Sequence, residues 1–427
     1  MQEAFLHYIW KLHYFNPEGL ETTCGLPIEI INNGQHNLHA GPDFSNAYIK
    51  IGEIFWAGNV EIHVHSIDWY AHKHQNDNAY NNVILHVVWE DKGKKAVTAE
   101  KVTLPVLELK PLVNPELIYR FEMMLKSEHT ISCAGDFHLV PEIHRNFMLE
   151  RVLVERLEKK ANFVLALLYQ NNTDWEETTY QLLMQRMGFK VNDNPFLELA
   201  KILPYRILRK HDNLIQIESL LFGQAGFLDD DLDDEYFKKL KKEYCYLAAK
   251  YKFKTKRLNK NQWKFMRLRP VNFPTIRLGQ IAALLFQHKK LFDLLTNQND
   301  PLDIVKLFEV KQSDYWLKHY QFGRLLHSGV PVIGKTSREL LLINVVVPLL
   351  VARSKYLDKP ELASLGFKVL SELKAENNHI IKKWKSIKSD ISNAYESQAY
   401  MELIESYCKK NQCLQCRIGH SLLGKNK

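Results

Sequence analysis

The stretch that decides the fold runs from His36 to Asp91 and reads HNLHAGPDFSNAYIKIGEIFWAGNVEIHVHSIDWYAHKHQNDNAYNNVILHVVWED. It holds seven of the 18 histidines in the 427-residue chain, at positions 36, 39, 63, 65, 72, 74 and 86. In its centre Glu61, His63 and His65 alternate with apolar residues. Side chains two residues apart on a strand share a face. The pattern therefore predicts a strand that presents a carboxylate and two imidazoles together.

A second predicted strand begins just upstream of this one. The turn Gly41-Pro42-Asp43 leads into an alternating run with apolar residues at 47, 49 and 51, which places Asp43 at the start of a neighbouring strand. Two strands that deliver Asp43 and Glu61 to one place are a common arrangement for a hard divalent cation. The alternative is a solvated strand face that carries polar residues for solubility. The density of such residues, next to the apolar run VILHVV, favours a site.

The order of predicted elements gives the fold class. An amphipathic helix at 2–14 precedes strands at 27–31, 45–51 and 55–65, a short crossover helix within 66–80 and a buried strand at 82–89. The region 96–109 contains Pro105 and reads as an edge strand. We expect an α+β or α/β domain with a mixed sheet, in which the third and fourth strands are parallel neighbours.

After Pro111 the pattern is helical to the end of the chain. Asp174 followed by Glu177 resembles a capping box at the start of one of these helices. We therefore expect two domains, 1–125 for the metal site and 126–427 for a large helical region, with a further break near residue 300 as an alternative.

Charge divides along the same boundary. Residues 1–125 contain nine Lys and Arg against 15 Asp and Glu, a balance of −6, whereas the rest of the chain has 48 against 34, or +14. An acidic part suits a cation and a basic part suits a polyanion, so nucleic acid is the expected partner. The oligomeric state is not predictable from these data.

Two compositional features bear on location. The longest apolar run, 340–352, is 13 residues long and contains Asn344 and Pro348, which makes it too short to span a bilayer. The first 15 residues lack the pattern of a signal peptide, and six cysteines do not make a disulfide framework. We expect a cytoplasmic protein that does not enter the membrane.

The segment Lys250–Pro270, KYKFKTKRLNKNQWKFMRLRP, has nine basic residues, no acidic residue and interleaved aromatics. Basic groups can bind phosphates and aromatic rings can stack on bases. The alternative is a solvated segment whose aromatics pack inward. The candidate nucleic-acid-binding residues are Lys254, Lys256, Arg257, Trp263, Lys264 and Arg267.

A second candidate metal site lies near the C-terminus. Cys408, Cys413, Cys416 and His420 fall within 13 residues and could supply a zinc site or part of an iron–sulfur site. Their spacing matches no standard motif closely, and the surrounding residues have a helical pattern.

Several motifs carry a family resemblance. GPDF, WAGNVEIHVHSIDW, HKHQNDNAYNNVILHVV, LLFGQAGF, RLRPVNFPTIRL and the closing CLQCRIG resemble those of an uncharacterised bacterial family, the domain of unknown function DUF2851. The resemblance covers nearly the whole chain and implies no established activity.

The N-terminal part also resembles the PD-(D/E)xK nuclease superfamily, whose fold runs helix, three strands, helix, strand. Pro42-Asp43 and Glu61-Ile62-His63 occupy its motif positions. The resemblance implies that Asp43 and Glu61 bind Mg²⁺ or Mn²⁺. His63 stands where that superfamily has lysine, and a neutral imidazole can orient water but lacks the permanent charge.

The remaining predicted metal ligands include His65, and further candidates are His72, His74, Asp77 and the helical Glu3. Some nucleases of that superfamily also hold an iron–sulfur cluster through cysteines at the end of the domain, with a spacing that differs from the one here.

Three functions follow as hypotheses. The first is a metal-dependent nuclease with Asp43, Glu61 and His63 as catalytic residues. The second is a small-molecule hydrolase or oxygenase that binds a transition metal through the histidines. The third is a nucleic-acid-binding or scaffold protein that has lost its catalytic chemistry.

Overall fold

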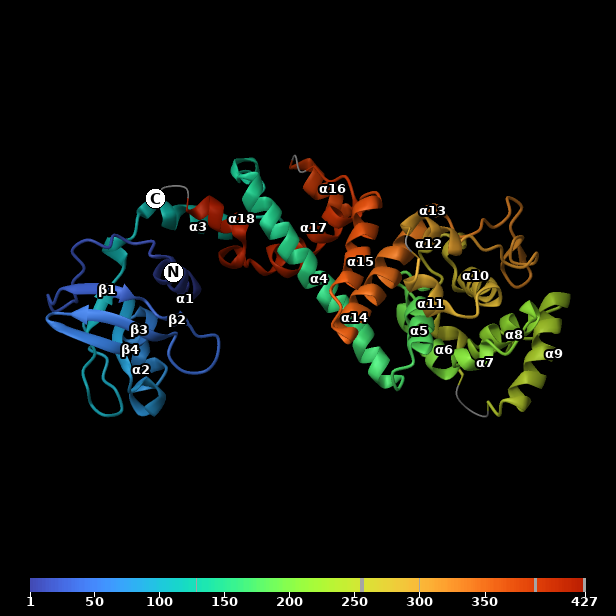
Figure 1. Cartoon of the computed structure of the whole chain (residues 1–427), viewed down its shortest axis with the longest axis horizontal. Helices are drawn as coiled ribbons and strands as arrows, with labels where there is room; N and C mark the ends of the chain where they lie inside the picture. The colour runs from blue at the N-terminus through green and yellow to red at the C-terminus, as the bar shows by residue number, and fades with distance from the viewer. Residues whose placement is uncertain (128, 254–256, 299, 388–389, 425–427) are drawn as a thin grey trace. The chain divides into compact units, whose positions relative to one another are not determined.

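The chain folds into two compact units. A computed structural model describes residues 1–127, 129–253, 257–298, 300–387 and 390–424. Unit 1 comprises Met1–Met148 and Leu403–Lys427, and unit 2 comprises Leu149–Glu402. An N-terminal mixed sheet is followed by a large helical region, as the sequence predicts for an α+β protein (Figure 1).

Unit 1 is built on a mixed sheet. Its strands are β1 (Ile28–Asn32), β2 (Gln35–His36), β3 (Phe44–Ile51), β4 (Ile54–His65), β5 (Val83–Glu90) and β6 (Val106–Glu108). The strand order is β1-β3-β4-β5-β6, and β2 also pairs with β3. The pairings of β3 are antiparallel, whereas β5 runs parallel to both β4 and β6. The predicted parallel pairing of the third and fourth strands is confirmed.

The connection between β4 and β5 differs from the single crossover helix that we expected. It consists of the short helix α2 (Asp68–Ala71) and two 3₁₀ turns, η1 (His74–Asn76) and η2 (Asn78–Tyr80). Lys73 lies between α2 and η1 with a left-handed backbone, φ 64°, which reverses the chain there. This compact path keeps His72 and His74 close to the end of β4.

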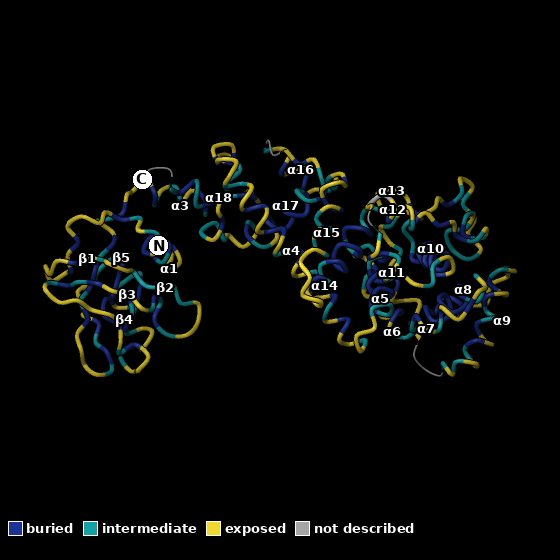
Figure 2. Tube along the Cα trace, viewed as in Figure 1, coloured by how far each residue is buried: buried dark blue, intermediate teal, exposed yellow. Residues whose placement is uncertain are grey.

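Strand β5 is covered on both faces of the sheet. All residues of β5 from Val83 to Trp89 are buried, as Figure 2 shows for the interior of the sheet. Helix α1 (Glu3–Leu12) packs against β4, and its side chains Phe5, Leu6 and Ile9 are fully buried. Burial on both faces explains why β5 reads as a continuous apolar run.

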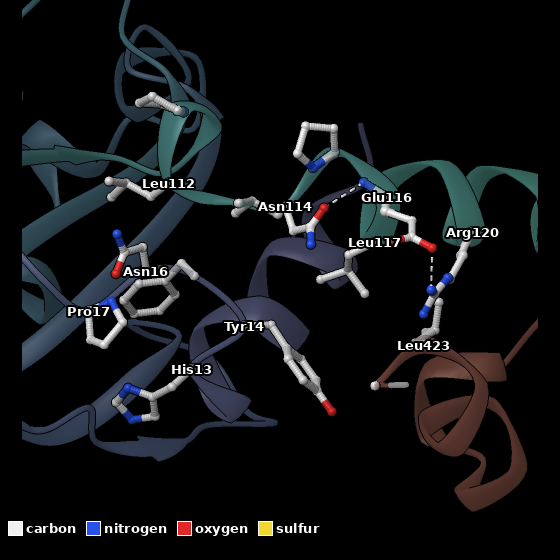
Figure 3. A pocket seen from close by; sticks show the side chains of 15 residues that line it. His13, Tyr14, Asn16, Pro17, Leu112, Asn114, Glu116, Leu117, Arg120 and Leu423 are labelled. Carbon is white, nitrogen blue, oxygen red and sulfur yellow. Dashed lines mark hydrogen bonds and ion pairs between the residues drawn. The ribbon is translucent and has the colours of Figure 1, made fainter. Parts of the chain in front are cut away.

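The C-terminal segment returns to unit 1. Helix α18 (Arg417–Leu423) packs against α3 (Pro115–Lys126), and the turn η9 (Cys413–Gln415) packs against α1. Figure 3 shows the pocket of about 650 Å³ that this packing leaves beside Tyr14 and Leu117, with Leu423 of α18 at its edge. The C-terminal segment thus belongs to the compact unit of the N-terminal sheet, although the sequence pattern groups it with the helical region 126–427. The remaining short turns of unit 1 are η3 (Lys110–Leu112), η4 (Phe137–Leu139) and η8 (Cys408–Lys410).

Unit 2 is helical. The long helix α4 (Glu142–Gln170) and helix α17 (Ala394–Ser406) connect the two units along the chain. The Asp174 carboxylate accepts a hydrogen bond from the backbone N–H of Glu177, so the predicted cap begins a helix as expected. The other helices are α5 (Trp175–Met187), α6 (Asp193–Ile202), α7 (Tyr205–Leu208), α8 (Leu214–Gln224), α9 (Glu235–Lys250), α10 (Pro274–Gln287), α11 (Leu291–Thr296), α12 (Pro301–Leu307), α13 (Lys335–Leu341), α14 (Val347–Leu357), α15 (Glu361–Glu372) and α16 (His379–Ser386).

Smaller elements complete unit 2. They are the turns η5 (Lys260–Gln262) and η6 (Pro270–Asn272) and the hairpin of β7 (His319–Gln321) and β8 (Arg324–Leu325). Residues 149–402 form one compact unit.

One helix is apolar enough to be compared with a membrane span. Helix α13, the π-helical turn η7 (Leu342–Val346) and α14 form a continuous stretch of 23 residues, Lys335–Leu357. By length and composition this stretch could cross a bilayer, but 61% of its most apolar window is buried inside the protein. Burial of this extent is typical of the core helix of a helical domain.

Candidate metal centre

Asp43 and Glu61 meet at one end of β3 and β4. Phe44 pairs with Val60 in the antiparallel register of these strands, which puts Asp43 opposite Glu61. The Asp43 backbone N–H donates to Glu61 Oε2 at 3.0 Å, and the Ile62 N–H donates to Asp43 Oδ2 at 3.0 Å. Each carboxylate is thus held by the backbone of the other strand.

Two histidines lie beside the second oxygen of Glu61, and a third lies beside one of them. Glu61 Oε1 lies 3.5 Å from His63 Nε2 and 3.2 Å from His74 Nε2. His63 Nε2 is in turn 3.1 Å from His72 Nδ1, and one ligand atom from each histidine lies within 4.8 Å of the others. A tetrahedral ion with ligand bonds of about 2.0–2.2 Å separates its ligands by roughly 3.3–3.6 Å. The three imidazole donors therefore have the spacing of ligands to a single ion, and Glu61 Oε1 lies beside two of them.

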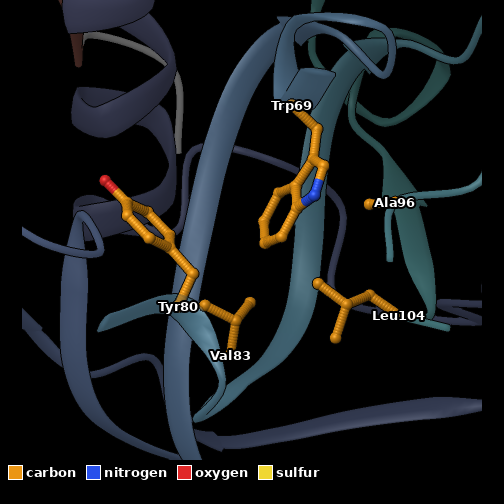
Figure 4. Close-up of a cluster of buried hydrophobic side chains, with 5 residues drawn as sticks. All are labelled: Trp69, Tyr80, Val83, Ala96 and Leu104. Atoms are coloured by element: carbon orange, nitrogen blue, oxygen red, sulfur yellow. The ribbon is translucent and has the colours of Figure 1, made fainter. Parts of the chain in front are cut away.

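An apolar cluster behind the centre fixes the imidazoles. Figure 4 shows Trp69 and Tyr80 within this cluster of buried side chains from the β4–β5 connection and the adjacent strands. The Tyr80 ring stacks on His74 with centroids 3.8 Å apart, and the Trp69 ring lies edge-on to His74 at 5.3 Å. Rings held in this way have few alternative orientations, which preorganises the donor atoms.

His86 supports His63 from the neighbouring strand. It lies opposite Glu61 in the parallel register of β4 and β5, and its Nε2 is 2.9 Å from His63 Nδ1. When the His63 Nδ1–H donates to His86, the lone pair of His63 Nε2 faces Glu61 and His72. Such a partner to the second ring nitrogen is usual for histidines that bind metals.

Burial keeps both rings neutral. Burial, followed by the nearby imidazoles, lowers the pKa of His63 to about 2. Burial and then His74 lower the pKa of His86 to about 4. A histidine must be neutral to bind a metal ion, so His63 is in the required state at neutral pH.

Helix α1 adds a charged pair to the centre. His7 Nε2 lies 3.2 Å from Asp43 Oδ2. Burial acts to lower the pKa of His7, but the hydrogen bond and charge of Asp43, with the charges of Glu3 and Glu61, outweigh burial and raise it. Burial and then Asp43 raise the pKa of Glu3, so this carboxylate also belongs to the centre. The loosely predicted helical glutamate is thus close to Asp43.

Two of the predicted ligands have other roles. The exposed Asp77 caps the turn η2 by accepting a hydrogen bond from the Ala79 N–H, and its carboxylate is used there. His65 falls outside the compact three-histidine group in the part of the chain that the structure describes. Its backbone N–H donates to Asp68 Oδ2 at 2.8 Å, which anchors the start of α2.

Sequence reasoning missed His7 and His86. His7 follows Glu3 by four residues, the spacing that puts two side chains on one helix face. His86 is the one polar residue inside the run VILHVV, and a polar side chain in a buried strand needs a hydrogen-bonding partner. Both patterns are visible in the sequence, but neither identifies the side chains that His7 and His86 contact in the fold.

Comparison with known proteins places the chain in a family. A family model described as "Protein of unknown function (DUF2851)" matches residues 3–379. The chain belongs to this family. No curated protein and no solved structure matches it. The region matched by DUF2851 contains the whole metal centre and ends before Cys408.

The basic segment of this DUF2851 chain differs from the prediction at Trp263. The side chain is 4% exposed, and its indole N–H donates to the Ala225 carbonyl oxygen at 2.8 Å. Its ring also packs edge-on against Phe196, with centroids 4.9 Å apart. Trp263 is therefore a core residue and is not available to stack on a base, which corrects the prediction.

The cations of that segment fall into three groups. Arg257 forms an ion pair with Asp229, and Lys260 with Asp230, so acidic residues 229–234 offset part of the basic charge. Lys264 and Arg267 are exposed. Lys254 and Lys256 lie outside the described residues.

The predicted C-terminal site also changes in composition. Cys408, Cys413 and Cys416 line one small cavity, and the fourth cysteine there is Cys133 from the α3–η4 loop. His420 Nε2 instead bonds to the Leu414 carbonyl oxygen, and the His420 ring lies edge-on to Tyr8, with centroids 5.0 Å apart. His420 therefore makes packing contacts and does not line this cavity.

Proposed function

We propose that this chain is a divalent-metal-dependent hydrolase that cleaves phosphodiester bonds in DNA or RNA. The observation that supports the proposal is the mutual hydrogen bonding of Asp43 and Glu61, which aligns two carboxylates at the end of adjacent strands. Glu3 of α1 lies close to them. The order of elements and the places of these residues resemble those of the PD-(D/E)xK nucleases.

The donor set favours the softer of the two predicted cations. The compact group consists of imidazole nitrogens of His63, His72 and His74, and one oxygen of Glu61 lies beside two of these rings. Mg²⁺ prefers oxygen ligands, whereas Mn²⁺ and other transition metals accept imidazole. We therefore propose Mn²⁺ rather than Mg²⁺. A divalent cation held by these residues would polarise a phosphoryl oxygen and lower the pKa of a bound water.

In PD-(D/E)xK nucleases a lysine supplies a positive charge beside the metal site. In this chain we assign cation binding to His63 and the positive charge to His7. His63 is neutral and nearly fully buried, so it can bind a cation but cannot supply a positive charge. His7 has a raised pKa and lies beside Asp43, so it keeps its proton to a higher pH than an ordinary histidine and can offer the charge to a phosphate. Asp43 can accept a proton from the attacking water through its carboxylate.

Cleavage assays with matched variants test the proposal. Full-length protein in Mn²⁺ is expected to cleave single-stranded or double-stranded nucleic acid. Asp43→Asn and Glu61→Gln keep side-chain size and are each expected to reduce the rate by at least about 100-fold, the usual contribution of a proton-transfer group. His138→Ala, at an exposed histidine of the same unit, is the control and retains the rate. Wild-type rates in both carboxylate variants would rule out the proposal.

The three-histidine group supports a second candidate. The same centre could hydrolyse or oxygenate a small molecule through a transition metal, because His63, His72 and His74 suit Zn²⁺ or Fe²⁺ as well as Mn²⁺. Turnover of small ester or phosphate substrates without nucleic-acid cleavage would favour this candidate. Nucleic-acid binding that persists in EDTA, with no cleavage in any metal, would instead indicate a binding protein.

A further inference from the structure

Four cysteines from distant parts of the sequence surround one small cavity in unit 1. Cys133 comes from the loop between α3 and η4, and Cys408 from η8, whereas Cys413 and Cys416 flank η9. Met124, Tyr407 and Gly419 complete the apolar part of the lining. The arrangement joins the C-terminal segment to a loop that precedes α4.

The backbone around Cys413 is built for close approach. A Cβ atom at Gly419 would lie 2.2 Å from the Cys413 carbonyl oxygen, so only glycine lets α18 pack on this turn. Asn411 has a left-handed backbone with φ 53°, which reverses the chain between Cys408 and Cys413. The Cys416 N–H donates to the Cys413 carbonyl oxygen at 3.2 Å, which closes the turn. These contacts direct three cysteines of one short segment toward the same cavity.

The thiols are close enough to interact electrostatically. Burial, then the neighbouring Cys416 and Cys413, raise the pKa of Cys133 to about 12. Burial and then Cys133, Cys416 and Cys413 raise the pKa of Cys408. Cys133 therefore lies close to the three C-terminal cysteines, although it is remote from them in sequence.

The four thiols are spaced more widely than the ligand atoms of the histidine centre. In the part of the chain that the structure describes, His63, His72 and His74 form the one group of three or more ligands compact enough for a single ion. Four thiolates on one Zn²⁺ ion, with bonds of about 2.3 Å, would lie roughly 3.8 Å apart. In a [4Fe–4S] cluster each thiolate binds a different iron, and in a [2Fe–2S] cluster only two thiolates share an iron, so the four thiolates as a set stand farther apart than on one Zn²⁺ ion. The wider arrangement favours a cluster.

We propose that Cys133, Cys408, Cys413 and Cys416 bind an iron–sulfur cluster that fastens the C-terminal segment to unit 1. Four cysteines are the common ligand set of [2Fe–2S] and [4Fe–4S] clusters. The proposal is independent of the chemistry at Glu61, because none of the four cysteines belongs to that centre.

Metal and sulfide analysis of three variants tests the assignment. Full-length protein is purified without oxygen, and its iron, acid-labile sulfide, zinc and visible absorption are measured. The wild type is expected to contain about two to four iron ions per chain with equal sulfide. Cys133→Ser removes one thiolate at nearly constant size and is expected to lose most of the iron and sulfide. Cys245→Ser, at an exposed cysteine of unit 2, and His420→Gln are expected to retain both.

Several results would overturn the assignment. Stoichiometric zinc without iron in the wild type would replace the cluster by a zinc site. Full iron in Cys133→Ser, or its loss in His420→Gln, would show that the ligands are assigned wrongly. If Cys133→Ser does not accumulate, Mössbauer and X-ray absorption spectra of the wild type decide: iron with sulfide and thiolate ligands supports the cluster, and protein without iron excludes it.

Discussion

The histidine centre of unit 1 and the basic segment of unit 2 were both candidates from sequence, and the structure treats them differently. Glu61 of β4 meets Asp43 and lies beside His63, because strand register fixes which side chains lie opposite each other. The basic segment instead places Trp263 in the core and pairs Arg257 with Asp229. Periodicity on a strand therefore predicts geometry, whereas charge composition leaves the direction of each side chain open.

The largest expected effect comes from a mutation of Trp263, which tests whether this residue belongs to the core. Trp263→Ala should lower the free energy of unfolding by about 3–5 kcal/mol, because it removes a buried indole and leaves a cavity. Urea unfolding followed by circular dichroism measures the change. Trp263→Phe keeps most of the volume and should be destabilised less. A loss below about 1 kcal/mol in Trp263→Ala would indicate a surface residue and return Trp263 to the candidates for base stacking.

A smaller effect is expected from mutation of His86, which tests whether this residue orients His63 for metal binding. His86→Leu removes the hydrogen-bonding partner of His63 Nδ1 and should weaken metal binding by about 10–100-fold. His86→Gln offers an amide oxygen in its place and should recover part of that affinity. Titration of EDTA-treated protein with Mn²⁺ supplies the numbers. Equal affinity in His86→Leu and the wild type would mean that the second strand does not orient His63.

The pair of His7 and Asp43 should appear as a pH-dependent stability. A histidine whose pKa is raised on folding stabilises the protein fully below its unfolded pKa, about 6.5, and loses this contribution as the pH rises through the folded pKa. Metal-free wild type should therefore exceed His7→Gln in stability by up to about 1 kcal/mol near pH 6. The difference should shrink toward pH 8.5, about two units above the ordinary histidine pKa. A constant difference across that range would contradict the pairing.

The smallest effect concerns the exposed cations of the basic segment. If the segment contacts phosphates, Lys264→Gln and Arg267→Gln together should flatten the log-log salt dependence of nucleic-acid affinity by about 1.4–1.8 units. Stability should change by less than about 0.5 kcal/mol, as for most exposed substitutions. Arg257→Gln and Lys260→Gln form the matched control, and their effect on the slope should be smaller because both residues already pair with aspartates. An unchanged slope in both pairs would assign the segment to ordinary surface.

Much of the fold followed from local patterns in the sequence. The continuous apolar run of β5 and the alternation in β4 predicted neighbouring parallel strands, and the structure pairs them. The turn before β3 predicted the place of Asp43. What remained hidden depends on contacts between distant segments. His7 reaches the centre through the packing of α1 on β4, and Cys133 meets the C-terminal cysteines through the return of the chain to unit 1.

The connection between β4 and β5 shows the same limit on a smaller scale. The polar residues of 66–80 suggested one crossover helix, but Lys73 adopts a left-handed backbone and the chain turns instead. This turn brings His74 under Tyr80 and beside Glu61. The sequence identified the histidines as candidate ligands, and the turn decided which of them share a site.

Binding of Mn²⁺ by the histidine centre tests the account most directly. Mn²⁺ is the suitable probe because it prefers nitrogen and oxygen ligands to thiolates, so the four cysteines should not compete for it. Calorimetric titration of EDTA-treated full-length protein should show one tight site per chain in the wild type and in His138→Ala. His74→Ala should bind at least about 100-fold more weakly, since loss of a ligand should cost no less than loss of an outer-shell partner. Equal affinity in His74→Ala, or no binding by the wild type, would contradict the account.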